Sequence, residues 1–263
     1  MEQLLVIKIG GNVVDDPDFL DRFLRDFASI PGPKLLVHGG GKVATRIGEK
    51  LGIESRYVDG RRITDEPTLD LVTMVYGGLV NKQLVARLQA VGCNAIGLSG
   101  ADGNLIPAHR RPVGRIDYGF VGDIDQDTLR LQPLEALLAA GMVPVVAPLT
   151  HDGAGHLLNT NADTIASCLA VLLSTRYRVR LMYCFEKNGV LGDITDESSV
   201  VHHIDQRLFD RMKAEGALAE GILPKLENAF AAIRQGVQEV LIGHARQLLA
   251  NTGDAVSGTL IQQ

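Results

Sequence analysis

The sequence of 263 residues has few cysteines, and none is placed for a metal site or a disulfide framework. Cys93, Cys168 and Cys184 are an odd number at wide spacing, and none belongs to a C-x-x-C pair or lies near a pair of histidines. A disulfide-stapled secreted domain and a cysteine-based zinc or redox centre are therefore not indicated. We expect three buried, reduced thiols.

Long apolar runs and an excess of charge of one sign are also lacking. No stretch approaches the length that spans a membrane, and the N-terminus has no basic segment followed by a long apolar run. The net charge is -5, and no block of like charges marks an interaction tail. We therefore expect a cytoplasmic protein with neither a membrane nor a nucleic acid as partner.

What the sequence does contain is an alternation of short β-rich apolar runs with amphipathic helical stretches. Candidate strands lie at 4–9, 34–38, 95–98, 143–147, 179–183 and 239–242. Candidate helices lie at 18–28, 42–51, 67–91, 133–140, 162–174, 205–215 and 224–235. This order is typical of a mostly parallel sheet with helices on both faces. The sequence therefore predicts an α/β three-layer sandwich with a central, mostly parallel sheet flanked by helices.

No internal repeat and no Pro/Ser-rich linker divides the chain. We therefore predict a single domain over residues 1–263, with a change of role near residue 175. The stretch 100–125 is rich in glycine and alternates polar with apolar residues, which predicts hairpins that project from the sheet. Such a flap could cover a small ligand.

A first glycine loop follows the first strand. Lys8 lies near the end of that strand, and Gly10 and Gly11 directly follow the strand. A phosphate could approach their backbone N–H groups closely, with the Lys8 ammonium as counter-charge. A tight strand-to-helix turn that needs glycine for its conformation alone explains the loop equally well.

A second glycine loop follows the second strand. His38 is followed by three glycines at 39–41, which expose N–H donors at the positive end of the next helix and favour an anion site. The run also fits the dinucleotide pattern G-x-G-x-x-A through Ala44, with Asp59 downstream, so a nicotinamide-dependent oxidoreductase is an alternative. That alternative leaves the first loop unexplained, whereas two loops on successive strands suggest phosphates held from two sides.

Polar residues later in the chain add candidate ligand contacts. The arginine pair at 61–62 precedes a helix, and a guanidinium can hold a carboxylate bidentately, although solvated surface arginines are commoner. Asn159, Asn161 and Asp163 fall at a loop-to-helix junction, where they could bind polar groups and orient cations, or simply cap the helix. Lys225 stands near a helix start, where a cation is locally unfavourable, which suggests a function.

As a set, these motifs resemble the acetylglutamate kinases of the amino acid kinase family. The motifs are K-x-G-G at 8–11, H-G-G-G at 38–41, G-x-R-x-T at 60–64, N-x-N-A-D at 159–163 and G-x-x-x-K at 221–225. The resemblance implies phosphorylation of the γ-carboxylate of an N-acylglutamate, in arginine biosynthesis, with ATP and Mg²⁺. It also implies an acyl-amino-acid lobe at about 1–175 and a nucleotide lobe at about 176–263.

The resemblance further implies a role for each motif residue. Lys8 and Lys225 neutralise charge on the transferred group, and Asp163 holds both lysines in place. The implied substrate-binding residues are Gly40, Gly41, Arg62, Asn159 and Asn161, and the implied phosphate-binding residues are Gly10, Gly11 and Gly39. A γ-carboxylate with a pKa of ~4.3 is already ionised at neutral pH, so no general base is needed. Mg²⁺ is expected on the nucleotide phosphates, with no metal-ligating residue.

Two departures from the family pattern bear on the ligands. Glu186 replaces the family's aspartate in the nucleotide half, which leaves the contacts of Glu186 and Lys187 open. Phe120 replaces a polar residue in the flap, and the stretch 150–152 is unusual. These features suggest N-succinylglutamate as an alternative to N-acetylglutamate.

Oligomeric state and rival activities complete the expectations. The chain begins at its first strand without the additional N-terminal helix of hexameric relatives, so we expect a homodimer that arginine does not inhibit. Carbamate, aspartate, glutamate and uridylate kinases share the glycine loops, but the motifs at 60–64 and 159–163 favour an acylglutamate. A ligand sensor without catalysis is disfavoured because both lysines and Asp163 are present.

Overall fold

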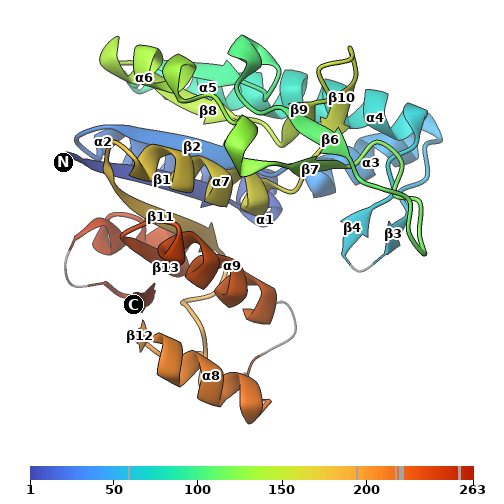
Figure 1. Cartoon of the computed structure of the whole chain (residues 1–263). Helices are drawn as coiled ribbons and strands as arrows, with labels where there is room; N and C mark the ends of the chain where they lie inside the picture. Colours follow the sequence, from blue (N-terminus) through green and yellow to red (C-terminus); the bar gives the residue numbers. More distant parts are fainter. Residues whose placement is uncertain (59, 194, 217, 219–221, 254–255) are drawn as a thin grey trace.

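The computed structural model describes residues 1–263 except 59, 194, 217, 219–221 and 254–255. An eight-stranded sheet in the order β12-β14-β13-β11-β1-β2-β8-β5 runs through it (Figure 1). Its strands are β1 (Gln3–Ile9), β2 (Lys34–His38), β5 (Ala95–Leu98), β8 (Val143–Val146), β11 (Arg178–Phe185), β12 (His203–Ile204), β13 (Glu239–His244) and β14 (Thr259–Ile261). All pairings in it are parallel except β13 with β14.

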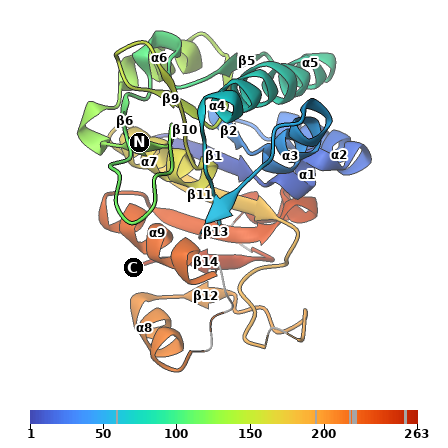
Figure 2. The same ribbon diagram turned by 90° about the vertical axis from the view of Figure 1, so that its right-hand side faces the viewer.

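Helices cover both faces of this sheet (Figure 2). One face carries α1 (Gly11–Asp15), α2 (Pro17–Ser29), α3 (Gly41–Leu51), α4 (Glu66–Val72) and α5 (Asn81–Ala90). The other carries α6 (Leu131–Ala139), α7 (Ala162–Ser174), α8 (Gln206–Ala214) and α9 (Ile222–Arg234). The predicted three-layer α/β architecture is confirmed, and each of the six predicted strands is present.

Strand β1 shows why its sequence is apolar almost throughout. Leu4 and Val6 belong to the core beneath α7, whereas Leu5 and Ile7 belong to the core beneath α2. Successive side chains of a strand point to opposite faces, so a strand buried on both sides must be apolar at every position. Lys8 is the one polar residue after the exposed Gln3, and it lies on the α7 side near the carboxyl end of the strand.

Capping residues set the helix boundaries. Asp16 accepts a hydrogen bond from the backbone N–H of Phe19 at the start of α2, and Asp65 accepts one from the N–H of Thr68 at the start of α4. These acceptors satisfy backbone donors that have no partner inside the helix. Gly52, with φ of 73°, ends α3 in the left-handed conformation that glycine adopts readily.

The helix predicted at 67–91 is interrupted by a stretch of different geometry. Between α4 and α5 the chain forms a π-helix, η1 (Thr73–Val80). Hydrogen bonds in such a segment join residues five apart, so the side chains that share a face differ from those of an α-helix. The apolar pattern of the sequence does not reveal this change.

Three small antiparallel hairpins lie beside the sheet. The segment predicted as a flap contains one hairpin, β6 (Ala108–Arg110) with β7 (Gly122–Ile124). Two others were not predicted, β3 (Tyr57–Val58) with β4 (Arg61–Arg62) and β9 (Leu149–His151) with β10 (Leu157–Asn159). Single bridges from residue 64 to 119 and from 121 to 159 join the hairpins to one another.

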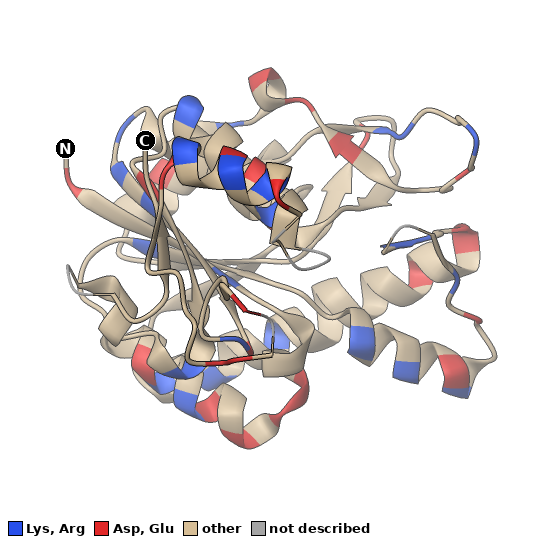
Figure 3. Ribbon diagram, turned by 90° about the horizontal axis from the view of Figure 1, so that it is seen from below, with Lys and Arg blue, Asp and Glu red and all other residues tan. Residues whose placement is uncertain are grey.

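The cysteines follow the sequence-based expectation only in part, because one of the three is not fully buried. Positively and negatively charged residues are interspersed along the helices (Figure 3). None of the helices described is long and apolar enough to cross a membrane. All three cysteines are free; Cys93 and Cys184 are buried and Cys168 is partly buried. Burial raises the pKa of the Cys184 thiol to about 12, so this group stays protonated.

Candidate active site

The two glycine loops lie side by side at the carboxyl edge of the sheet. Strands β1 and β2 are parallel neighbours, with Lys8 opposite Val37, so their carboxyl ends meet at the same edge. A Cβ atom added to Gly39 would lie 3.5 Å from the backbone nitrogen of Gly11. The parallel topology therefore brings together the two loops that the sequence places 28 residues apart.

Two lysines and an aspartate form a charged cluster beside these loops. The Nζ atom of Lys8 lies 2.7 Å from Oδ1 of Asp163, and the Nζ atom of Lys225 lies 2.7 Å from its Oδ2. Strand β1, the first turn of α7 and the start of α9 supply the three side chains. Their side chains are 14%, 18% and 28% exposed, so the cluster is sheltered but open to a ligand.

The electrostatics of the cluster leave it with an excess of positive charge. Burial alone would raise the pKa of Asp163, but the ammonium groups of Lys8 and Lys225 outweigh burial and lower this pKa to about 2. The carboxylate is therefore ionised at neutral pH and holds both ammonium groups. Two positive charges against one negative charge suit a ligand with a high negative charge.

This pairing predicts an acid-dependent loss of stability. The pKa of Asp163 in the folded protein, about 2, lies below the ordinary value, so its stabilising effect is full near neutral pH and is lost as pH falls toward 2. Between pH 5 and pH 3 we expect the free energy of unfolding to fall by about 1 kcal/mol more in the wild type than in Asp163→Asn. Urea unfolding at the two pH values measures this difference.

A matched control variant separates the effect of the Asp163 ion pairs from the effect of an acidic residue in the first turn of a helix. Asp18 holds the second position of α2, as Asp163 does in α7, and no lysine or arginine forms an ion pair with it in the described structure. Asp18→Asn should therefore keep the wild-type change between pH 5 and pH 3. A change in Asp163→Asn equal to that of the wild type would contradict the assignment.

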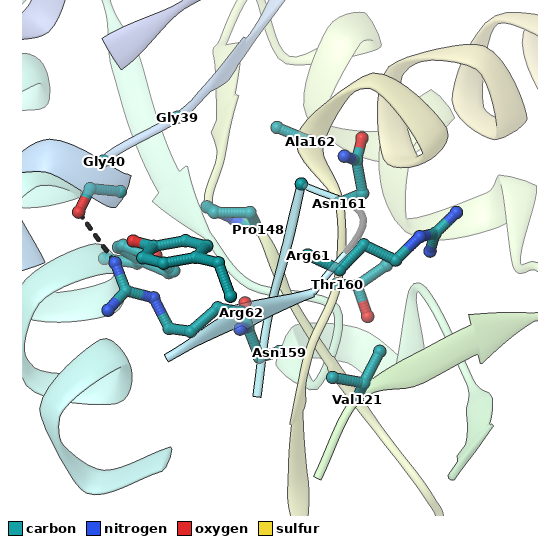
Figure 4. Close-up of a pocket in the computed structure, with 14 residues that line it drawn as sticks. Gly39, Gly40, Arg61, Arg62, Val121, Pro148, Asn159, Thr160, Asn161 and Ala162 are labelled. Carbon is teal, nitrogen blue, oxygen red and sulfur yellow. Dashed lines mark hydrogen bonds between the residues drawn. The ribbon is translucent and has the colours of Figure 1, made fainter. Parts of the chain in front are cut away.

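A cavity of about 210 Å³ lies between the second glycine loop and the start of α7 (Figure 4). All the predicted substrate-binding residues line it, namely Gly40, Gly41, Arg62, Asn159 and Asn161, together with Gly39. Arg61, named with Arg62 as a candidate carboxylate contact, also lines it. The sequence did not single out the further lining residues Tyr57, Tyr76, Val121, Pro148 and Thr160. Lys8, Gly10, Gly11, Asp163 and Lys225 are not among its lining residues; Asp163 directly follows the wall residue Ala162.

Arg62 is held firmly on one side of the cavity. It is buried, and its Nη2 atom donates to the carbonyl oxygen of Gly41 at 2.8 Å and to Oγ1 of Thr45 at 3.0 Å. Its Nη1 atom donates to the hydroxyl of Ser55, and its guanidinium lies 4.8 Å from the ring centre of Tyr57. A cation fixed in this way is pre-organised to receive a carboxylate.

The two asparagines combine structural contacts with free polar groups. The side-chain oxygen of Asn161 accepts from the backbone N–H groups of Asp163 and Thr164, at 2.8 and 3.2 Å, so this residue caps α7. Asn159 donates from Nδ2 to Oγ1 of Thr64 at 2.9 Å. Within the described chain, the amide nitrogen of Asn161 and the amide oxygen of Asn159 form no hydrogen bond and remain available to a ligand.

The loop glycines differ in whether their N–H groups are free. Gly10 donates to the carbonyl oxygen of Cys184 at 3.3 Å, and Gly39 donates to that of Ile9 at 3.1 Å. Backbone acceptors thus already use these two N–H groups, and phosphate contacts of Gly10 and Gly39 stay a prediction. The N–H groups of Gly11, Gly40 and Gly41 have no acceptor among the residues that the structure describes.

The residues that suggested a bulky acyl group do not face the cavity. The Phe120 ring packs 6.2 Å from the His156 ring and 4.6 Å from the Arg110 guanidinium, and its neighbour Val121 lines the cavity instead. Thr150 is buried, with its hydroxyl 2.7 Å from that of Thr160. Neither feature therefore supports a larger acyl group.

Other residues named from the sequence either do not line the cavity or lie outside the described residues. Glu186 is exposed after β11 and accepts a hydrogen bond from Nδ2 of Asn12, and Lys187 pairs with Glu197 at 3.0 Å. Asp59, the acidic residue of the dinucleotide pattern, and Gly221, the first residue of the last motif, lie outside the described residues.

Comparison with known proteins identifies the family of the chain. A family model described as the amino acid kinase family matches residues 3–244. The acetylglutamate kinase of Cytophaga hutchinsonii is 53% identical over 264 residues, covering 99% of each chain, and that of Bacteroides fragilis is 54% identical over 255 residues, covering 97% of each. The chain therefore belongs to the amino acid kinase family and, within it, to the acetylglutamate kinases.

A solved structure shares the fold at much lower sequence identity. The N-acetylglutamate synthase of Neisseria gonorrhoeae, complexed with coenzyme A and N-acetyl-glutamate, superposes with a TM-score of 0.84 at 21% identity. The match covers 100% of this chain and 59% of that one. The same architecture therefore occurs as part of a longer protein.

Proposed function

We propose that this protein transfers the terminal phosphoryl group of ATP to the γ-carboxylate of N-acetylglutamate, as a step of arginine biosynthesis. The high identity to acetylglutamate kinases over nearly the whole chain supports this reaction. The observation that carries the proposal is the contact of Lys8 and Lys225 with the two oxygens of Asp163. Two fixed cations beside the glycine loops suit the transfer of a highly charged group.

The reaction needs charge neutralisation rather than proton transfer. A γ-carboxylate with a pKa of ~4.3 is ionised at neutral pH, and one of its oxygens forms the new bond to phosphorus. The bond from phosphorus to the β–γ bridging oxygen breaks, and ADP leaves with the electron pair. Lys8 and Lys225 stabilise the negative charge on the transferred group, which is the main contribution a protein makes to phosphoryl transfer.

The cation that accompanies ATP does not require a ligand from the chain. Among the described residues, no group of three or more His, Cys, Asp or Glu side chains is placed to hold a metal ion. Both oxygens of Asp163 are already in contact with ammonium groups. We infer that Mg²⁺ is bound by the phosphate oxygens of ATP, where it offsets their charge.

The two lobes divide the substrates between them. The cavity is built from residues before about 175, and there we expect Arg62 to bind the α-carboxylate of the acylglutamate and Asn159 its acylamino group. ATP is expected on the lobe at about 176–263, which supplies Lys225. The continuous sheet joins both lobes, because β11 of the second pairs with β1 of the first.

Replacement of Arg62 by lysine is expected to raise KM for N-acetylglutamate about 10- to 100-fold with a small change in kcat. A lysine keeps the charge but cannot hold a carboxylate with two parallel hydrogen bonds. Initial-rate kinetics at saturating ATP measure kcat and the KM for N-acetylglutamate separately. Arg56→Lys, which alters an exposed pair with Asp65, should leave both constants unchanged. A fall in kcat at unchanged KM would contradict this role of Arg62.

A second candidate substrate is N-succinylglutamate, and Arg61 is the observation that favours it. Arg61 is exposed and lines the same cavity, and its side chain forms no hydrogen bond or ion pair within the described chain. Figure 4 shows its guanidinium turned in a different direction from that of Arg62. A carboxylate at the end of a succinyl group could pair with it. If so, Arg61→Gln should lower kcat/KM for N-succinylglutamate about tenfold and leave that for N-acetylglutamate unchanged.

ADP release from MgATP tests the proposed reaction and its rivals together. N-acetylglutamate and N-succinylglutamate are compared with aspartate, glutamate and carbamate at equal concentrations. The proposal predicts that one of the two acylglutamates has the highest kcat/KM. A higher value for any other acceptor would overturn it in favour of another activity of the family.

We also propose that the active form is a homodimer that arginine does not inhibit. Met74 and Leu79, 56% and 40% exposed on η1, are large apolar side chains that a second copy could cover. Light scattering should give twice the mass of one chain, and arginine should leave the initial rate unchanged. A monomeric mass would contradict the homodimer, and strong inhibition by arginine would contradict the predicted insensitivity to arginine.

A further inference from the structure

A buried histidine lies directly behind the second glycine loop. His38 ends strand β2, and its side chain has no exposed surface. Its Nδ1 atom lies 2.7 Å from the carbonyl oxygen of Gly39, and its Nε2 atom lies 3.1 Å from Nδ2 of Asn81. The imidazole therefore bridges the loop and the start of α5.

The surroundings of the ring determine which nitrogen carries the proton. Burial lowers the pKa of His38 to about 4, so the ring is neutral and has one N–H group. A carbonyl oxygen can only accept, so Nδ1 must donate to Gly39. Nε2 therefore accepts from the amide of Asn81.

The Asn81 amide is itself held from several sides. Its nitrogen also donates to the carbonyl oxygen of Val145 at 2.9 Å, and its oxygen accepts from Nζ of Lys82 at 3.1 Å. A Cβ atom on Gly97 would lie 2.0 Å from that oxygen, so β5 passes too close for the amide to move aside. The hydrogen bond to His38 thus has a fixed donor.

This contact sets the direction of one free N–H group in the loop. In a trans peptide the carbonyl group and the following N–H group point in opposite directions. The Gly39 carbonyl points inward to His38, so the N–H of Gly40 points away from it, toward the cavity that Gly40 lines. The N–H of Gly39, bound to the carbonyl oxygen of Ile9, anchors the other end of the residue.

The π-helix η1 also contacts the second glycine loop. Its hydrogen bonds join residues five apart, which brings Tyr76 and Asn81 to the same side of the helix. A Cβ atom on Gly40 would lie 2.8 Å from the Tyr76 ring. The Tyr76 ring therefore packs against the loop at Gly40, and the Asn81 amide contacts the loop through His38.

We propose that His38 and Asn81 are positioning residues that aim the N–H group of Gly40 at an anionic oxygen of the reacting group. The inference rests on the proposed kinase function for its chemistry and on the hydrogen bonds above for its geometry. A pre-oriented backbone donor of this kind stabilises charge as it develops, because it need not reorient during the reaction.

Two substitutions at His38 separate positioning from stability. His38→Asn keeps a short amide that can still donate to the Gly39 carbonyl, whereas His38→Leu fills the site without a donor. Leucine suits a fully buried position better, so the leucine variant should be at least as stable as the asparagine variant. We expect the opposite order in kcat. His38→Leu should lower kcat about 100-fold, whereas the kcat of His38→Asn should be at least tenfold higher than that of His38→Leu. The KM of both variants for ATP should stay within threefold of wild type.

We would measure kcat, KM and the thermal melting temperature of both variants and of the wild type. In the wild type, the ¹H–¹⁵N resonance of Gly40 would be followed during titration with inorganic phosphate. Folded variants whose kcat follows their stability, or a His38→Leu variant with wild-type kcat, would overturn the inference. So would a Gly40 resonance in the wild type that does not respond to phosphate. A wild type without acylglutamate turnover would refute the proposed function alone, and the phosphate titration would still decide the role of His38.

Discussion

Lys8→Met is expected to lower kcat about 10²- to 10³-fold, with KM for both substrates changed much less. Methionine keeps most of the length and packing of the lysine side chain but removes its charge. The interaction that it abolishes is strongest when negative charge is spread over the transferred phosphoryl group. Its loss should therefore affect the chemical step more than substrate binding.

The control for this variant is another lysine engaged in an ion pair. Lys213 lies 2.7 Å from Glu227 on the surface between α8 and α9. Lys213→Met should have wild-type kinetics, because exposed ion pairs contribute little and neither Lys213 nor Glu227 lines the cavity. A Lys8→Met variant with wild-type kcat and raised KM would show that Lys8 only binds the substrates.

Asp163→Asn is expected to lower kcat about 10²-fold or more at saturating substrates. An amide of the same shape offers an oxygen to one lysine but an N–H group to the other, so Lys8 and Lys225 can no longer both be held. The two ammonium groups would then repel each other across the site. Steady-state kinetics of the folded variant measure the loss.

Asp18→Asn again provides the comparison, because it removes an acid from the equivalent position of α2. Asp18→Asn should have wild-type kcat, which would exclude a general effect of first-turn acids on helix stability. An Asp163→Asn variant that keeps kcat within threefold of wild type would remove the aspartate from the catalytic cluster.

The main sheet could be predicted because its strands are apolar on both faces and are separated by helices with clear start signals. Strand β14 could not, because its three residues lie between β12 and β13, antiparallel to β13, and no local pattern indicates these pairings. The π-helix was also missed, since its residues satisfy the apolar pattern of an ordinary helix. Both features depend on contacts between distant segments.

The charged cluster could be anticipated only from the resemblance to the acetylglutamate kinases, because Lys8 lies on a strand whereas Asp163 and Lys225 lie at helix starts. The contacts of single atoms could not. The sequence does not show that the Gly10 N–H is used by Cys184, or that Phe120 turns away from the cavity while Val121 faces it. The link between His38 and Asn81 joins residues 43 positions apart, so no local pattern signals it.

The most direct test of the account is to trap the product with hydroxylamine. Wild-type protein, MgATP and N-acetylglutamate or N-succinylglutamate are incubated with hydroxylamine, which converts an acyl phosphate into a stable hydroxamate that mass spectrometry can locate. We expect a γ-hydroxamate in amounts equal to the ADP released, and at least 100-fold less of it with Lys8→Met. ADP release without hydroxamate from either substrate would contradict phosphoryl transfer to the γ-carboxylate.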